Sequence, residues 1–390
     1  GEHIWFGTET GGINLLNPRQ LSIRSYRHDK ENPSSLSYNP VNAIYEDAYG
    51  TLWVGTVEGG LNRKERNSED FTHYTREHGG LSHNSVSALT SDADNHLWIG
   101  TWGGGLNLLD LKAPRQILEV ISSQTGGGFP INFIGVLNYD PINEGIWIGA
   151  NQGLYFYDPV KKEITAPLPD KAAENIHGCI GSIIDKEGKL WVGCLEGVYI
   201  IDLHSRSSKG EFQYRHLNYK LDDPSSRLIE KITCFYQGKD GTLWLGSNGY
   251  GIYQRKIDAQ GKEQFISYST AQGLPNNSVR GILEDNNGNL WISTNNGLSC
   301  YHQAENRFIN YTIQDGLIDT QFYWNASCGS SHDLLYFGSV GGLVAIESNR
   351  PAASLPAAKV RFTRLRIGNE EILPGSEYLS EDIAITTELR

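Results

Sequence analysis

A short apolar phrase recurs eight times along the chain: an aromatic residue, an apolar residue, a glycine and a small residue. The copies are WFGT, WVGT, WIGT, WIGA, WVGC, WLGS, WIST and YFGS, beginning at Trp5, Trp53, Trp98, Trp147, Trp191, Trp244, Trp291 and Tyr336. Successive copies lie 44 to 53 residues apart. A fixed period of this length is the signature of an array built from one supersecondary unit.

Within one period the hydrophobic pattern forms four short runs separated by turn residues. In the second copy these runs are 41–47, 51–56, 61–66 and 71–77. Asp and Asn close to a Gly favour tight turns between paired strands. The phrase's glycine suits strands crowded against a neighbouring sheet, and its tryptophan supplies apolar area between sheets. The unit therefore predicts one four-stranded antiparallel blade of a β-propeller, an all-β fold.

The number of blades depends on the first strand of each unit. Seven complete first strands begin near Val41, Val86, Asn132, Ile176, Ile229, Val279 and Phe322. They predict a seven-bladed ring closed by an edge strand at 21–28, and an eight-bladed ring is the alternative. The expected domains are the tail of a preceding blade or propeller at 1–19, the propeller at 20–350, and a hinge with the first strands of a truncated β-sandwich at 351–390.

Composition narrows the function classes. The net charge is −12 and basic residues are dispersed, which argues against nucleic acid as a partner of this region. The five cysteines have neither metal-ligand nor redox spacing, so we expect small buried core residues. No apolar run is long enough to cross a membrane, so membrane attachment is expected only through segments outside this chain.

The repeats EDAYGTLWVGTVEGGLN and SDADNHLWIGTWGGGLN, with the lead-ins GLSHNSV and GLPNNSV, resemble the two-component regulator propeller repeat. The segment KVRFTRLRIGNEEI resembles the start of the immunoglobulin-like domain that follows such propellers. The resemblance implies the periplasmic sensor region of an inner-membrane hybrid two-component system, as found in gut Bacteroidetes. Such a sensor would detect an oligosaccharide, signal to a histidine kinase that regulates polysaccharide-utilisation genes, and work as a homodimer in the intact receptor.

Ligand contacts are expected on the face where the loops between second and third strands meet the blade-joining loops. Trp102 and Tyr250 stand among glycines in loops of the first kind, where sugar rings can stack on them, although such aromatics also pack on neighbouring loops. The polar candidates in the blade-joining loops have groups that suit hydroxyl-rich or carboxylate-bearing ligands, although Asn also caps turns. These candidates are Tyr38, His83, Asn84, Arg227, Asn277, Arg280, Gln321, Tyr323 and Trp324.

Catalysis is not expected of this region. Glycoside hydrolysis needs two carboxylates that flank the bond, and the acids here fall chiefly in turns or outer strands. The histidines lack metal-ligand spacing, so neither a metal nor a cofactor is expected. The alternative functions are a scaffold for protein–protein contacts and, with less support, a carbohydrate-active propeller enzyme.

Overall fold

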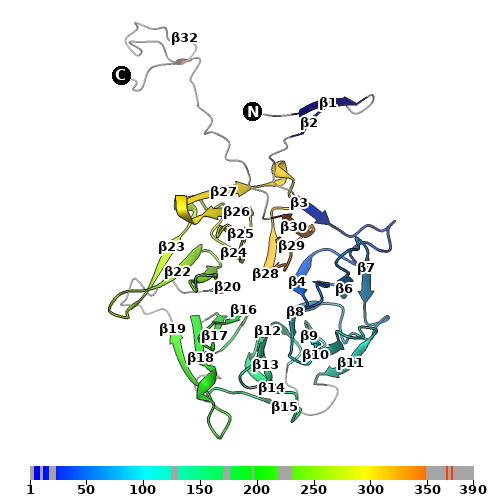
Figure 1. Cartoon of the computed structure of the whole chain (residues 1–390), viewed down its shortest axis with the longest axis vertical. Coiled ribbons are helices and arrows are strands. Elements are labelled where there is room, and N and C mark those ends of the chain that lie inside the picture. The colour runs from blue at the N-terminus through cyan, green and yellow to red at the C-terminus, as the bar shows by residue number, and fades with distance from the viewer. Residues whose placement is uncertain are drawn as a thin grey trace. The chain divides into compact units, whose positions relative to one another are not determined.

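The chain forms a ring of seven four-stranded antiparallel sheets. The computed structural model describes residues 4–8, 12–16, 23–123, 131–169, 176–195, 197–217, 231–347, 366–367 and 370–371. Within the compact unit Leu21–Arg350, the first strand of each sheet faces the central axis and the fourth lies at the rim (Figure 1). The predicted seven-bladed propeller is confirmed, and the eight-bladed alternative is wrong.

The blades follow one another along the chain. From the axis outward, blade 1 consists of β4 (Val41–Glu46), β5 (Leu52–Thr56), β6 (Leu61–Lys64) and β7 (Phe71–Tyr74), and blade 2 of β8 (Val86–Ser91), β9 (His96–Thr101), β10 (Leu106–Asp110) and β11 (Ile117–Ile121). Blade 3 consists of β12 (Ile134–Asp140), β13 (Gly145–Ala150), β14 (Gly153–Asp158) and β15 (Glu163–Thr165), and blade 4 of β16 (Gly181–Ile184), β17 (Lys189–Cys194), β18 (Gly197–Asp202) and β19 (Gln213–Leu217). For blade 5 they are β20 (Ile232–Gln237), β21 (Leu243–Ser247), β22 (Ile252–Ile257) and β23 (Glu263–Tyr268); for blade 6, β24 (Val279–Glu284), β25 (Leu290–Thr294), β26 (Gly297–His302) and β27 (Arg307–Tyr311); and for blade 7, β28 (Phe322–Gly329), β29 (Leu334–Ser339), β30 (Gly342–Glu347) and β3 (Ile23–Tyr26). Among the described residues, four short 3-10 helices lie between strands: η1 (Leu203–Ser205), η3 (Thr270–Gln272), η4 (Gln303–Glu305) and η5 (Ile313–Asp315).

The ring is closed by a strand from the beginning of the chain. β3 pairs antiparallel with β30, with Ile23 opposite Ile346 and Tyr26 opposite Leu343 (Figure 1). Blade 7 is thereby built from both ends of the propeller sequence, as the edge pattern at 21–28 predicts. This pairing satisfies the edge of β30, because its backbone groups gain a partner strand.

Each repeat aromatic packs against the next blade. Trp147 of blade 3 shares a core with Leu190 and Val192, which flank the tryptophan of blade 4. The same contact closes the ring, where Tyr336 of blade 7 packs with Leu52 and Val54 of blade 1; the seven aromatics are each at most 6% exposed. The phrase is therefore a unit of interblade packing.

The glycine of the phrase is required by close approach between blades. A Cβ on Gly55 would lie 2.5 Å from Cγ1 of Val86 in the next blade, and one on Gly338 would lie 2.7 Å from the carbonyl oxygen of Val41. Real Cβ contacts are not this short, so a side chain would push the blades apart.

One element differs in position from the sequence expectation. The inner strand of blade 4 begins at Gly181 and not near Ile176, because Gly178 and Cys179 donate backbone hydrogen bonds to the loop of blade 3, at Asn151 and Ala150. Outside the propeller unit, β1 (Ile4–Thr8) pairs with β2 (Gly12–Leu16), and β31 (Arg366–Ile367) pairs with β32 (Glu370–Glu371). The expected hinge and most of the expected β-sandwich lie outside the described residues.

Candidate functional site

One face of the ring is formed by two sets of loops that bond to each other. The backbone N–H of Gly103, between β9 and β10, donates to Asn132, which precedes β12, at 2.7 Å. Gly249, between β21 and β22, donates in the same way to Asn277, which precedes β24, at 3.0 Å. The blade-joining loops and the second-to-third-strand loops therefore share a face, as expected from the blade topology.

Two exposed aromatic residues on this face come from neighbouring blades. Trp102 is 38% exposed and forms an isolated β-bridge with Phe133, which is 51% exposed and stands just before β12. Gly103 and Gly105 have φ of 124° and 78°, a backbone that L side chains rarely adopt, and they turn the loop beside Trp102. Sequence reasoning identified Trp102 but missed Phe133, because only the backbone bridge between blades brings the two residues together.

Tyr250 lies in the equivalent loop of blade 5 but two positions further along. Its backbone N–H donates to Oγ of Ser247, as that of Gly104 donates to Oγ1 of Thr101 in blade 2. Its side chain is 41% exposed. Tyr250 thus stands where blade 2 has a glycine, and it forms a second exposed aromatic group on this face.

Several polar candidates have structural tasks inside the loops. Oδ1 of Asn84 accepts from the backbone N–H of Arg76, and Oδ1 of Asn277 accepts from that of Thr270, both at 2.8 Å. Nδ1 of His83 accepts from the Ser85 N–H at 3.0 Å. These acceptor atoms hold the turns, and Nδ2 of Asn84 also donates to Oε2 of Glu77 at 3.4 Å, so both polar atoms of the Asn84 amide are engaged.

The other loop candidates differ in their surroundings. Tyr38 is 37% exposed, and the charge and hydrogen bond of the nearby Glu58 carboxylate raise the pKa of its phenol. Gln321 is exposed and its backbone N–H donates to Asp319 at 2.9 Å. Arg227 lies outside the described residues.

Arg280 and the candidates of blade 7 come together near the axis. Arg280 is only 7% exposed, and its guanidinium carbon lies 3.5 Å from the ring centroid of the half-buried Trp324. Tyr323 packs against the core between blades 7 and 1, and burial raises the pKa of its phenol. Sequence reasoning selected these three residues separately and did not predict the stacked pair.

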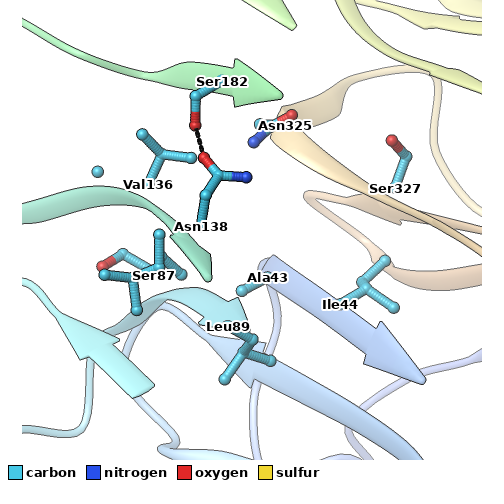
Figure 2. A pocket seen from close by; sticks show the side chains of 12 residues that line it. Ala43, Ile44, Ser87, Leu89, Val136, Asn138, Ser182, Asn325 and Ser327 are labelled. Carbon is cyan, nitrogen blue, oxygen red and sulfur yellow. Dashed lines mark hydrogen bonds between the residues drawn. The ribbon is translucent and has the colours of Figure 1, made fainter. Parts of the chain in front are cut away.

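A cavity of about 150 Å³ lies on the axis, enclosed by the inner strands β4, β8, β12, β16 and β28. Figure 2 shows Asn138 and Ser182, which are joined by a hydrogen bond, with Asn325 and Ser327 of β28 contributing further polar groups. Its lining residues are Ala43, Ile44, Ser87, Ala88, Leu89, Gly135, Val136, Leu137, Asn138, Ser182, Asn325 and Ser327. All of them are uncharged, so the cavity offers amide and hydroxyl groups.

The aspartates that recur with the repeat have a structural role. In five blades an Asp carboxylate accepts a hydrogen bond from the indole Nε1 of the repeat tryptophan. The pairs are Asp47–Trp53, Asp92–Trp98, Asp140–Trp147, Asp185–Trp191 and Asp285–Trp291, at 2.7 to 3.1 Å. Sequence reasoning assigned these acids to turns, and the bond to the tryptophan explains why they stand six or, in blade 3, seven residues before it.

Metal-ligand clusters and membrane-spanning helices are both absent from the described residues. These residues contain no group of three or more His, Cys, Asp or Glu side chains that could hold a metal ion. No helix in this part of the chain is long and apolar enough to cross a membrane.

Four segments of the chain match the family described as two component regulator propeller: residues 35–58, 80–103, 228–249 and 273–296. Histidine kinase P4 of Formosa agariphila is 27% identical over 210 residues, which cover 52% of this chain and 14% of that protein. The extracellular domain of the hybrid two-component system BT3049 from B. thetaiotaomicron is 27% identical with a TM-score of 0.72, over 89% of this chain and 44% of that one. PorZ from Porphyromonas gingivalis, at 16% identity and a TM-score of 0.59 over 80% of this chain and 47% of that one, shares the fold alone.

The chain thus spans less than half the length of these relatives. The matched segments cover the inner half of blades 1, 2, 5 and 6, where the repeat phrase and its lead-in occur. The resemblance inferred from the repeats is confirmed: the chain is a seven-bladed propeller that carries two-component regulator propeller repeats and is similar in sequence and fold to the extracellular domain of a hybrid two-component system.

Proposed function

We propose that this chain is the ligand-sensing, periplasmic region of a hybrid two-component histidine kinase in the inner membrane, and that its ligand is an oligosaccharide. The sensor role is supported by the propeller repeats and by the similarity to the BT3049 extracellular domain and to histidine kinase P4. Kinase activity belongs to the intact protein in this proposal, and the chain described here binds ligand without turning it over.

The proposed ligand class is based on two exposed aromatic residues of neighbouring blades, Trp102 and Phe133. Both residues are more than one-third exposed, and the polar residues His83 and Asn84 lie in the blade-joining loop of the same face. The apolar faces of sugar rings stack on such exposed aromatic residues, and the surrounding polar groups can bond the sugar hydroxyls. Tyr250 on blade 5 offers a second stacking group on the same face.

The ring itself suggests how binding is transmitted. Every blade packs against both neighbours, and β3 joins the first and last blades, so the ring has little freedom to change its internal shape. Ligand binding would therefore alter the orientation or the pairing of whole propellers. We expect a homodimer in the intact receptor and, as output, the regulation of polysaccharide-utilisation genes.

Two measurements test this proposal. The purified chain is screened on an array of neutral and acidic plant and host glycans, and hits are checked by calorimetry and by chromatography for products. The intact receptor is then tested with the same sugars in a transcriptional reporter strain. Binding without turnover, together with a reporter response, supports the proposal. Turnover that one Asp or Glu substitution abolishes, or a reporter that responds to no glycan, would contradict it.

A further inference from the structure

In several blades the second residue of the inner strand bonds one blade to the next. In blades 1, 2 and 5 this residue sits at the register shift between the first two strands and is buried. Its side chain donates a hydrogen bond to the carbonyl of the residue that begins the next inner strand. The bonds run from Asn42 to Val86 at 3.1 Å, from Ser87 to Ile134 at 2.6 Å and from Thr233 to Val279 at 2.8 Å. A short polar side chain at this place therefore links neighbouring blades.

Arg280 occupies the same place in blade 6 and makes no such bond. Val279 pairs with Thr294 and Gly281 with Ser293, so Arg280 stands at the register shift. Its Nε and Nη1 atoms are buried without a hydrogen-bond partner among the described residues. The ring of Trp324 attracts the cation but accepts no hydrogen bond from the in-plane N–H groups of Nε and Nη1.

An insertion in β28 brings Trp324 to this position. In the other blades with a register shift, the inner strand advances by two residues where its partner strand advances by one. In β28, Phe322 pairs with Ser339, but Ser327, five residues on, pairs with Phe337. The extra residues include Trp324 and Asn325, whose φ of 50° lies in the left-handed region. This strained bulge places an indole against Arg280 and an amide in the axial cavity.

Among the described residues, no carboxylate is paired with this cation. The axial cavity beside this bulge is lined only by uncharged residues. Burial lowers the pKa of the Arg280 guanidinium, and the group that acts against this shift is the Cys234 thiol, not a carboxylate. In a chain of net charge −12, a buried arginine without an acidic partner is a costly arrangement.

We infer that Arg280 and Trp324 form a subsite for the carboxylate of an acidic sugar, a hexuronate unit of the ligand. This inference rests on the proposed sensing function and narrows its ligand class. The stacked indole fixes the guanidinium plane, and a carboxylate is the planar, charged acceptor that suits N–H groups left without partners. Asn325 and Ser327 line the axial cavity next to this bulge, and their amide and hydroxyl groups suit sugar hydroxyls of the same ligand.

The test compares acidic oligosaccharides with their methyl esters, which keep the shape and lose the charge. Calorimetry is carried out with oligogalacturonates and glucuronate-containing oligosaccharides on the wild-type chain and on Arg280→Gln. We expect at least one acid to bind, and Arg280→Gln to weaken the acid by about tenfold or more while changing the ester by less than about twofold. Arg255→Gln is the matched control, because Arg255 also stacks on a tryptophan, Trp191, but is paired with Glu263.

Each other outcome contradicts the subsite. It is wrong if no uronate binds, if Arg280→Gln weakens acid and ester equally, or if sulfated neutral sugars show the Arg280 dependence and uronates do not. Near-ultraviolet circular dichroism of the variant shows whether its fold is intact, and Arg280→Lys gives a second variant that keeps the charge. If neutral glycans bind and drive the reporter while uronates do not, the sensing function stands and only this subsite fails.

An independent observation concerns two cysteines of blade 4. The Sγ atoms of Cys179 and Cys194 lie 3.2 Å apart, and both residues are at most 2% exposed. They hold the places that the facing pair Val41 and Thr56 holds in blade 1. Facing residues of paired strands have Cβ atoms about 4.5–5.5 Å apart, so a small approach would reach the Cβ separation of about 3.5–4.5 Å in a disulfide.

We propose that Cys179 and Cys194 form a disulfide when the protein folds in an oxidising compartment. One thiolate attacks a disulfide of a thiol–disulfide oxidant and forms a mixed disulfide with it. The second thiolate attacks the cysteine sulfur of this mixed disulfide and releases the oxidant in its reduced thiol form, so that two electrons and two protons pass to the oxidant. The protein is refolded with oxidised glutathione, alkylated after denaturation and digested without reduction. A linked Cys179–Cys194 peptide with alkylated Cys234 and Cys300 supports the proposal. Alkylation of both Cys179 and Cys194, or their linkage to other cysteines, overturns it.

Discussion

The indole Nε1 of Trp191 donates a hydrogen bond of 2.7 Å to Oδ2 of Asp185, and both residues are buried. The other carboxylate oxygen, Oδ1, accepts from the backbone N–H groups of Glu187 and Lys189 in the turn. One carboxylate thus holds the hairpin turn and orients the ring that packs on the next blade. This double role explains why an aspartate recurs before the repeat tryptophan.

Asp185→Ala is therefore expected to lower the free energy of unfolding by about 1.5–3 kcal/mol, because it removes charged hydrogen bonds and leaves a buried indole N–H without its acceptor. Denaturant titration measures the loss. Asp240→Ala is the matched control: Asp240 holds the turn of blade 5 through Thr242 but is exposed, and Gly238 stands there in the place of Asp185. Equal losses in the two variants would show that the turn alone, and not the bond to the tryptophan, matters.

Truncating the exposed aromatics should separate binding from stability. Trp102→Ala, Phe133→Ala and Tyr250→Ala are each expected to weaken oligosaccharide binding by about 1–3 kcal/mol, a typical effect for an aromatic anchor. Their melting temperatures should stay close to wild type, because these rings lie outside the cores between blades. Trp191→Ala should do the reverse and lose about 3–5 kcal/mol of stability, as for a large core truncation.

Calorimetry and thermal unfolding on the same preparations check this pattern. Normal binding in all three loop variants would place the ligand elsewhere, for example on a surface shared by two propellers. A large loss of melting temperature in Trp102→Ala would show instead that this ring is part of the packing.

The fold could be predicted from the sequence because its determinants lie within each repeat. Gly55 permits the close approach of two blades, and Trp53 is buried between them. Both requirements return in each repeat, so the same residue types recur with the period. The closure of the ring by β3 follows from the number of strands. The last blade has only three strands from the end of the propeller sequence, so its outer strand must come from the beginning.

The candidate site could be predicted only in part, because it depends on contacts between repeats. Phe133 gains its role from a bridge to Trp102 across two blades. Asn84 and Asn277 look like ligand-binding amides in sequence, yet their carbonyl oxygens cap turns. Arg280 and Trp324 were both selected from sequence, but the bulge that stacks them, and the missing acceptors around the guanidinium, exist only in three dimensions.

The free energy of unfolding should fall in acid partly because the ion pairs of Glu263 with the arginines of blades 4 and 5 are lost. Burial disfavours the Glu263 carboxylate, but hydrogen bonds and charge from Arg215 and Arg255 outweigh this and hold its pKa below the ordinary value. A lowered folded-state pKa adds stability above the unfolded pKa of about 4.3, and this stability is lost as the pH falls through the folded value. Wild type should therefore lose more stability than Glu263→Gln between about pH 5 and pH 3.

Urea midpoints of both proteins at pH 7, 5, 4 and 3 check this difference, with the largest gap at neutral pH and convergence in acid. Parallel curves for the two proteins would mean that Glu263 does not titrate differently in the folded and unfolded states. Glu305→Gln is a suitable control, because its contact with Arg307 is exposed and such pairs contribute little.

Arg280→Met should raise the stability of the chain while removing the proposed uronate subsite. The substitution replaces a buried cation, whose Nε and Nη1 lack partners, with an apolar side chain that can still pack on Trp324. Replacing poorly compensated buried charge with apolar groups often stabilises proteins by about 1–4 kcal/mol. Arg255→Met should have the opposite effect, because Arg255 lies against Trp191 but bonds Glu263 at 2.7 Å. Chemical denaturation distinguishes the cases: a clear loss of stability in Arg280→Met would mean that the guanidinium holds the blades together and is not kept for a ligand.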